Sequence, residues 1–258
     1  MTDELRLHIE NGIATLTMNR PERRNAMNRA MLNGLVSHMD ELDSNPEVRV
    51  VVVRGEGPGF CSGMDLREMR QRQDDPKGDP ESGVTQVLQR VERSRHPTIA
   101  MVHGDAIAGG CELALHCDLR VMAETARIGM PLARIGMIVP FPLGQKLVEI
   151  IGPAFTRQIL LTGQPVDARR AYEIGMVHTV VPAAELERAT YDLARTIAGN
   201  APLSLAGMKA TIRRSVALRD RIEHADLDEL ARRARASADA REGVRAMLDK
   251  RKPIFRGE

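Results

Sequence analysis

Apolar and polar positions alternate along the first twenty residues and then change to a helical period. Residues 5–9 and 13–18 alternate with a period of two around Asn11-Gly12, which predicts a β-hairpin with a tight turn. Residues 27–42 place apolar side chains at helical spacing and predict an amphipathic helix. Further short apolar runs predict strands at residues 48–53, 98–102, 119–123, 126–130 and 177–181.

Helical spacing returns between these strands and dominates the last part of the chain. Residues 84–93 and 143–150 predict helices, and Gly152-Pro153 breaks the second one. Strands that alternate with helices favour a parallel, superhelical α/β core. Residues 183–250 are almost entirely helical, so we expect apolar helix faces there to serve a subunit interface. The polar, Pro- and Gly-rich residues 71–83 are typical of a lid or rim beside a ligand.

One strand-loop-helix segment, residues 102–120, combines features that suit a chemical site. Gly104, Gly109 and Gly110 let the backbone approach a ligand, and a helix that begins after them offers unpaired N–H groups. Glu112 lies in the first turn of this helix among apolar residues. An anion-stabilising loop beside a carboxyl group suits acid–base chemistry on a carbonyl compound. Paired glycines and a first-turn glutamate are also ordinary features of helix starts, so this pattern alone leaves both interpretations open.

Composition narrows the classes of function. The 258 residues include no Trp, two Tyr and four Phe, and the formal net charge is +2. Nucleic-acid binding through base stacking therefore lacks its side chains, and we expect no nucleic-acid partner. The three cysteines are not spaced with other potential metal ligands, and their number is odd. They therefore predict neither a disulfide framework nor a metal site. No apolar run is long enough to span a membrane, so we expect a cytoplasmic protein without a membrane partner.

Several segments together resemble the crotonase (enoyl-CoA hydratase/isomerase) superfamily. No single segment is diagnostic, but their order and spacing run almost from end to end of the chain. They are Asn19-Arg20-Pro21 with Arg24-Asn25-Ala26, Phe60-x-x-Gly63-x-Asp65-Leu66, residues 104–118, Thr162-Gly163 to Gly175-Met176-Val177, and Lys250-Arg251-Lys252-Pro253-x-Phe255.

The resemblance implies a ββα superhelix, an α/β core over residues 1–195, with a C-terminal helical trimerisation region over residues 196–258. It implies a homotrimer or a dimer of trimers that binds acyl-CoA thioesters, with coenzyme A entering as part of the substrate and no separate cofactor. The backbone N–H groups of Met64 and Gly109 match the pair that holds the thioester oxygen as it becomes an enolate. The residues expected at the substrate are Arg24, Ala26, Ser62, Met64, Asp65, Leu66, Arg67, Gly109, Gly110, Leu132, Arg134 and Lys250.

The chain departs from the family at a position that takes part in proton transfer in the family's hydratases. Hydratases of the family use two glutamates, and Glu112 matches the first. The second belongs to a Gly-x-Pro-Glu segment, which here ends in Leu132, a side chain that cannot hold a proton. Either Glu112 works alone, or Asp105, His103 or Arg134 compensates, or the protein binds acyl-CoA with little chemistry. We expect an enoyl-CoA hydratase with Glu112 as its single base; a one-base enoyl-CoA isomerase and a non-catalytic acyl-CoA binder are the alternatives.

Overall fold

A twisted, mostly parallel sheet forms the centre of the molecule. The computed structural model describes residues 4–72, 82–216 and 222–257, and within them the larger sheet has the strand order β1-β2-β3-β4-β6-β9. Only β1 and β2 pair antiparallel; the other neighbours run parallel. The strands are β1 (Leu5–Glu10), β2 (Ile13–Met18), β3 (Val50–Gly55), β4 (Thr98–Val102), β6 (Leu119–Ala123) and β9 (Thr179–Val181).

Turn chemistry fixes the N-terminal hairpin. Asn11 and Gly12 both adopt positive φ, 51° and 78°. Two consecutive residues in this region match the twist of the flanking strands, and asparagine and glycine adopt it at low cost. The predicted hairpin is therefore confirmed, with Glu10 paired to Ile13 across the turn.

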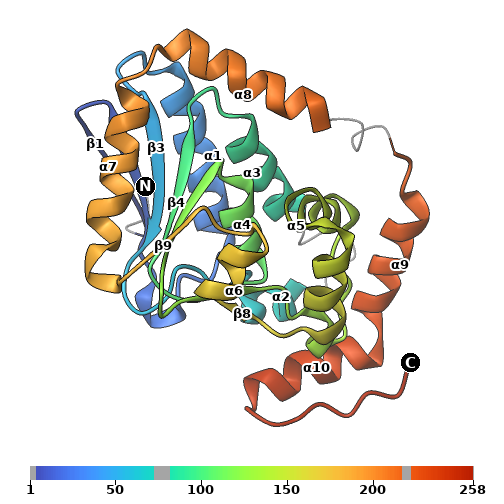
Figure 1. The fold of residues 1–258 in the computed structure, drawn as a ribbon. Helices are drawn as coiled ribbons and strands as arrows, with labels where there is room; N and C mark the ends of the chain where they lie inside the picture. The colour runs from blue at the N-terminus through green and yellow to red at the C-terminus, as the bar shows by residue number, and fades with distance from the viewer. Residues whose placement is uncertain (1–3, 73–81, 217–221, 258) are drawn as a thin grey trace.

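Helices cover both faces of this sheet (Figure 1). The helix α7 (Leu186–Ala198) packs on one face, against β2, β3, β4 and β6. On the other face lie α1 (Arg29–Ser44), α3 (Ser82–Arg93) and α4 (Gly109–His116). Methionines fill much of the space that aromatic side chains occupy in other cores, and the fully buried ones include Met18, Met27, Met31 and Met39.

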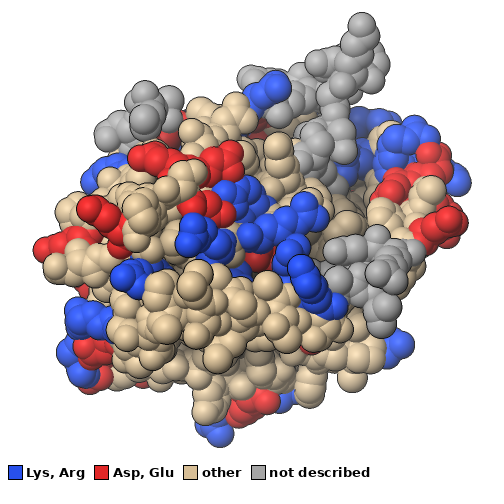
Figure 2. Space-filling view, turned by 90° about the horizontal axis from the view of Figure 1, so that it is seen from above, with Lys and Arg blue, Asp and Glu red and all other residues tan. Residues whose placement is uncertain are grey.

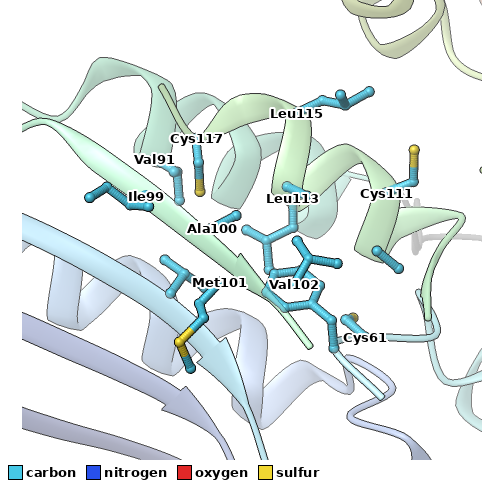
Figure 3. Close-up of a cluster of buried hydrophobic side chains, with 14 of the residues drawn as sticks. Cys61, Val91, Ile99, Ala100, Met101, Val102, Cys111, Leu113, Leu115 and Cys117 are labelled. Carbon is cyan, nitrogen blue, oxygen red and sulfur yellow. The ribbon is translucent and has the colours of Figure 1, made fainter. Parts of the chain in front are cut away.

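The contact between β4 and α4 anchors the loop between them. Figure 3 shows Leu113 of α4 pointing toward Ala100 and Val102 of β4, while Leu115 points away from the strand. Leu113, Ala100 and Val102 are fully buried, so the start of α4 has little freedom to move. The nearby cysteines at 61, 111 and 117 are buried and free, which agrees with the expected absence of disulfides.

A second, smaller sheet combines one strand before α4 with two strands after it. It joins β5 (Ala106–Ile107), β7 (Arg127–Gly129) and β8 (Val166–Asp167). The helix α5 (Phe141–Thr162) is kinked at Gly152, whose φ is 67°, as the Gly-Pro break predicts. The remaining elements of this part are the helices α2 (Leu66–Arg72) and α6 (Ala168–Glu173) and the 3-10 turns η1 (Pro21–Arg23), η2 (Leu132–Ile135) and η3 (Ala183–Glu185).

The chain ends in three helices that leave the sheet. They are α8 (Pro202–Val216), α9 (Ala225–Ala236) and α10 (Ala238–Leu248). In Figure 1, α8 crosses the top of the molecule and α10 returns below α5. Lys209 ties α8 to the core through its Nζ atom, which donates to Asp118 at 2.6 Å and to the carbonyl oxygen of His96 at 3.0 Å.

Two predictions on chain organisation stay untested. The helix α7 runs through the proposed division at residue 195 and ends at Ala198. Most of the predicted lid, residues 73–81, lies outside the described residues. Within the part of the chain that the structure describes, no helix has the length and hydropathy needed to cross a membrane.

Candidate active site

A cavity of about 700 Å³ opens at the N-terminal end of α4. The loops that follow β3 and β4 form one side of it, because the carboxyl ends of parallel strands meet at one edge of the sheet. Residues of α2, α3, η2, the start of α5 and the end of α10, together with residues in and around β7, form the rest. Its size lies within the usual range for small-molecule sites.

Met64 and Gly109 line this cavity, and the backbone N–H groups of both lack a backbone acceptor among the described residues. The Met27 amide donates to the Gly63 carbonyl at 2.7 Å and the Asp65 amide donates to the Met27 carbonyl at 3.0 Å, which leaves the Met64 N–H on the other side of the strand. Gly109 is the first residue of α4, so its N–H has no acceptor within the helix. Among the hydrogen bonds of the described residues, neither amide has a backbone acceptor.

Glycines bring these two amides together. A Cβ atom on Gly63 would lie 3.0 Å from the Gly109 nitrogen, and one on Gly110 would lie 2.0 Å from the Cys61 carbonyl oxygen. Only glycine permits such an approach, and Gly63 also has a φ of 93°. Unpaired N–H groups at a helix start are able to stabilise an oxygen that gains negative charge.

Ala108, which precedes these groups, has a strained backbone. Its φ of 52° and ψ of −119° are unfavourable for a residue with a side chain. Two hydrogen bonds hold it there: its amide donates to the Gly129 carbonyl at 2.9 Å, and its carbonyl accepts from the Glu112 amide at 3.1 Å. Such strain persists where neighbouring structure enforces it, and it is concentrated at functional sites.

Glu112 is a buried acid without a hydrogen-bond partner. Its side chain is fully buried, it lines the cavity, and neither carboxyl oxygen has a partner in the structure. Burial raises the pKa of Glu112 well above its usual value of 4.5, and the charge of Lys146 opposes this shift only in part. Burial therefore favours the neutral, protonated form of this side chain over the carboxylate.

The neighbours of Glu112 keep its carboxyl group free for a ligand. His116 Nδ1 donates to the Glu112 backbone carbonyl at 2.8 Å and stays 3.7 Å from Oε2, outside hydrogen-bonding distance. Lys146 forms ion pairs with Glu92 at 3.1 Å and Glu149 at 2.8 Å. Buried oxygens without hydrogen bonds lower the stability of the fold. A ligand that binds to these oxygens would explain why the protein keeps them.

The cavity wall also includes apolar side chains of η2 and α5. Leu132 and Ile135 of η2 and Leu143 of α5 belong to it. Apart from Glu112, Asp105 is the only acid among the described residues that line the cavity, and Arg127 neutralises it through contacts at 2.7 and 3.2 Å. The site thus has one carboxyl group available for proton transfer.

The comparisons with known proteins agree with this arrangement. A family model described as enoyl-CoA hydratase/isomerase matches residues 8–258. The chain belongs to the enoyl-CoA hydratase/isomerase family. It is 32% identical to 2,3-dehydroadipyl-CoA hydratase of Escherichia coli (strain K12), with 98% of this chain and 99% of that protein covered. It is 34% identical to a putative enoyl-CoA hydratase of Thermus thermophilus, with 96% of this chain and 100% of that protein covered.

A solved structure extends the likeness to three dimensions. Methylmalonyl-CoA decarboxylase in complex with 2-nitronate-propionyl-CoA has a TM-score of 0.90 and 25% identity, with both chains fully covered. The crotonase-like α/β fold that the sequence predicts is thereby confirmed, and the chain is an acyl-CoA-processing member of the family. Trimerisation stays a prediction.

Several residues that the family resemblance singled out do line the cavity. They are Arg24, Ser62, Met64, Leu66, Gly109, Glu112 and Leu132. Ala26 and Gly110 are buried behind this wall, and Asp65 holds the Arg20 side chain at 3.1 Å and receives the Arg67 amide at 3.1 Å. These residues support the loop that carries the Met64 amide.

Three predicted ligand residues lie elsewhere. Arg134 is exposed, and its Cγ atom lies beside Gly163 at the end of α5, so it does not border the cavity with Leu132 as expected. In the single turn of η2, successive side chains point in different directions, which turns Arg134 outward. Arg67 and Lys250 are also exposed and are not among the described residues that line the cavity.

The candidates for replacing the second glutamate have structural partners. Asp105 pairs with Arg127, and the His103 Nε2–H donates to the Gly57 carbonyl at 2.9 Å. Burial lowers the pKa of His103, so its imidazole is neutral. His116 and Asp118 make structural hydrogen bonds, His116 to the Glu112 backbone carbonyl and Asp118 from the Thr98 amide.

Sequence reasoning missed several contributors to the cavity, among them Met247 and Met130. Met247 of α10 lines it from a position 135 residues after Glu112, and Met130 lies within the segment that ends in Leu132. The helical pattern of residues 238–248 does not reveal which face meets η2. Only the glycines give a signal, because Gly136 and Gly243 permit a close contact between the two elements.

Proposed function

We propose that this protein hydrates 2-enoyl-CoA thioesters with Glu112 as its only proton-transferring side chain. One observation carries the proposal: both carboxyl oxygens of Glu112 are buried at the cavity without a partner. One oxygen is thus available to accept a proton from water while the other gives one to the substrate. The family membership supplies the thioester as the substrate class.

In this mechanism the Met64 and Gly109 N–H groups bind the thioester oxygen. The oxygen atom of a water molecule forms a bond to C3 of the enoyl group, and electrons move to the thioester oxygen, which becomes an enolate. One water proton goes to the first oxygen of Glu112, and the proton of the second oxygen goes to C2. The product is a 3-hydroxyacyl-CoA, and Glu112 ends neutral, as it began.

The raised pKa of Glu112 favours hydration over isomerisation. A one-base isomerase begins by removing a proton from the substrate, which requires the carboxylate form. Burial disfavours that form, whereas the concerted addition of water begins from the neutral acid. Leu132 on the cavity wall adds no charge that would favour ionisation.

The polarity of the cavity orients the substrate. Arg24 lies beside Gly59, and Gly59 lies beside Asp105 and its partner Arg127, so the polar groups gather at one end. We place the phosphates of coenzyme A at this end, as part of the substrate and not as a separate cofactor. The three buried, unpaired cysteines support a reducing compartment, the cytoplasm.

The first test follows the loss of the conjugated enoyl-thioester absorbance with a panel of trans-2-enoyl-CoA substrates. Glu112→Gln keeps the shape of the side chain but cannot transfer protons, so we expect kcat to fall by about 10²–10⁴-fold. Glu124→Gln, at an exposed position after β6, is the matched control and keeps the rate. Turnover that survives Glu112→Gln would refute this assignment.

The pH dependence separates the proposed reaction from its alternatives. A neutral acid loses activity as the pH rises through its raised pKa, whereas a carboxylate base gains activity over the same range. We expect kcat for hydration to fall at high pH. A rate that rises there, with a 3-enoyl-CoA as substrate, would indicate an isomerase, and tight acyl-CoA binding without any turnover would indicate a binder.

A further inference from the structure

Methionine is the commonest side chain in the apolar part of the cavity. Five methionines line it, namely Met64, Met69, Met130, Met137 and Met247. Methionine is unbranched and polarisable, so it adapts to the shape of its neighbour and carries no charge. A wall built this way suits an apolar ligand of variable shape.

Three of these methionines, Met64, Met69 and Met137, belong to one group of packed apolar side chains. Met69 and Met137 form one buried cluster with Ile135 and Val244, and Met64, Leu66 and Leu132 pack against it. We call this cluster, together with Met247, the methionine chamber. Because the Met64 amide belongs to the thioester site, the chamber is where the acyl chain would extend once the phosphates occupy the polar end.

No unpaired cation faces the chamber among the described lining residues. The two arginines of the cavity, Arg24 and Arg127, lie at the polar end, and Arg127 is already paired with Asp105. A carboxylate at the far end of an acyl chain would therefore be buried without a counter-charge, which is costly. Apolar acyl chains gain from the same burial.

We propose that the methionine chamber selects acyl groups that are bulky and uncharged, tolerates differences in their shape, and rejects acyl groups that end in a carboxylate. This proposal rests on the proposed acyl-CoA function, and it adds the substrate class. Met247 has a central part in it, because it brings α10 of the C-terminal region to the acyl chain. The side chain is 44% exposed, so it lies at the rim of the chamber.

Binding of saturated acyl-CoA thioesters tests this without any turnover. Isothermal titration calorimetry would compare coenzyme A, butyryl-CoA, hexanoyl-CoA, octanoyl-CoA, 3-phenylpropanoyl-CoA and adipyl-CoA. We expect octanoyl-CoA to bind roughly tenfold or more tighter than butyryl-CoA, since each buried methylene adds affinity. Adipyl-CoA has the same six acyl carbons as hexanoyl-CoA but ends in a carboxylate where hexanoyl-CoA ends in a methyl group, and we expect it to bind about tenfold or more weaker. The phenylpropanoyl ester should bind within about fivefold of the octanoyl ester.

A charge placed at the rim should reverse the preference. Met247→Lys puts an ammonium group at the chamber on a side chain long enough to reach water, so the fold is preserved. We expect it to bind adipyl-CoA at least as tightly as hexanoyl-CoA. Leu161→Lys, at an exposed apolar residue near the end of α5, is the matched control and keeps the original order.

The outcomes separate this proposal from the proposed function. Equal affinity for hexanoyl-CoA and adipyl-CoA in the unaltered protein, or no dependence on chain length, would overturn the chamber's role while leaving acyl-CoA binding intact. If neither coenzyme A nor any thioester binds, the acyl-CoA function itself is wrong. If the chamber binds as proposed but enoyl-CoA is not hydrated, only the reaction is wrong.

Discussion

Glu112 combines two properties that oppose each other, a role in chemistry and a cost to the fold. A carboxyl group without partners in an apolar site is hard to ionise. The unfolded chain ionises the same group readily above pH 4.5, so proton loss favours the unfolded state. The enzyme therefore keeps its acid ready for reaction at the expense of stability, which is a common arrangement in active sites.

This opposition predicts that Glu112→Gln stabilises the protein. Below the ordinary pKa of 4.5, both folded and unfolded states hold the proton, so the two proteins differ little. As the pH rises above this value, the native protein loses stability relative to the variant until the raised pKa of the folded state is reached. Near neutral pH we expect Glu112→Gln to raise Tm by about 3–8 °C.

Thermal unfolding followed by circular dichroism from pH 4 to pH 8 measures how the difference in Tm between Glu112→Gln and the unaltered protein changes with pH. The gain should shrink toward pH 4. Glu124→Gln, at an exposed site, should leave Tm unchanged at every pH. A gain in Tm that stays constant over this range would mean that proton binding to Glu112 is not its source.

At the scale of elements, the contact between α10 and η2 sets the shape of the chamber. A Cβ atom on Gly243 would lie 2.5 Å from the Ile135 backbone, and one on Gly136 would lie 2.8 Å from the Asp239 carbonyl carbon. Backbone atoms cannot move aside as a side chain can, so only glycine allows the two elements to meet. Met247 reaches the cavity because of this contact.

We therefore predict that Gly243→Ala pushes α10 away from η2. It should lower the free energy of unfolding by about 1–3 kcal/mol and weaken octanoyl-CoA binding. Gly207→Ala is the matched control, because a Cβ atom there meets nothing within 4 Å, and it should add about 0.5–1 kcal/mol. Urea denaturation and calorimetry measure both effects. A Gly243→Ala protein as stable as the parent would contradict the tight contact.

The elements differ in how far the sequence predicts them. The hairpin at Asn11-Gly12 and the kink at Gly152 follow from local backbone chemistry, and both are confirmed. The two-residue strands β5 and β8 were missed because so short a pairing depends on distant partners, as in the contact of Ala106 with Ile128. Helix α2 was missed as well, next to residues whose polar composition predicts a loop.

The residues of the candidate site also differ in how far the sequence predicts them. Glycine spacing and a first-turn acid point to Gly109 and Glu112 because these features lie within one short segment, the family resemblance adds Met64, and all three line the cavity. The outward direction of Arg134 and the arrival of Met247 depend on tertiary packing. Local sequence therefore predicts the reacting groups, while packing between distant segments decides what surrounds the acyl chain.

At the scale of the whole molecule, the C-terminal region has apolar side chains that remain exposed among the described residues. Helix α8 has no buried residue, and its Leu203, Met208 and Ile212 are 63–82% exposed. Figure 2 shows a broad area of uncharged side chains beside a group of Lys and Arg on the face that α8 crosses in Figure 1. A helix of this length gains little stability in water unless it packs on another surface.

We predict that a second copy of the chain covers this surface and that the protein assembles as a trimer or a dimer of trimers. Sedimentation velocity should give three or six times the mass of one chain. Met208 and Ile212 lie one turn apart on α8, so Met208→Glu with Ile212→Glu should shift the protein toward monomers through burial of two charges.

Leu161→Glu is the control for this substitution, because Leu161 is equally exposed but lies at the end of α5. It should keep the native mass. A protein that sediments as a monomer before any substitution would refute the assembly. A native mass in the double variant would instead move the interface away from α8, toward other exposed apolar residues such as Leu227 and Leu230 of α9. Because no residue of α8 is buried, monomers should also show faster proteolysis of α8 than the assembled protein.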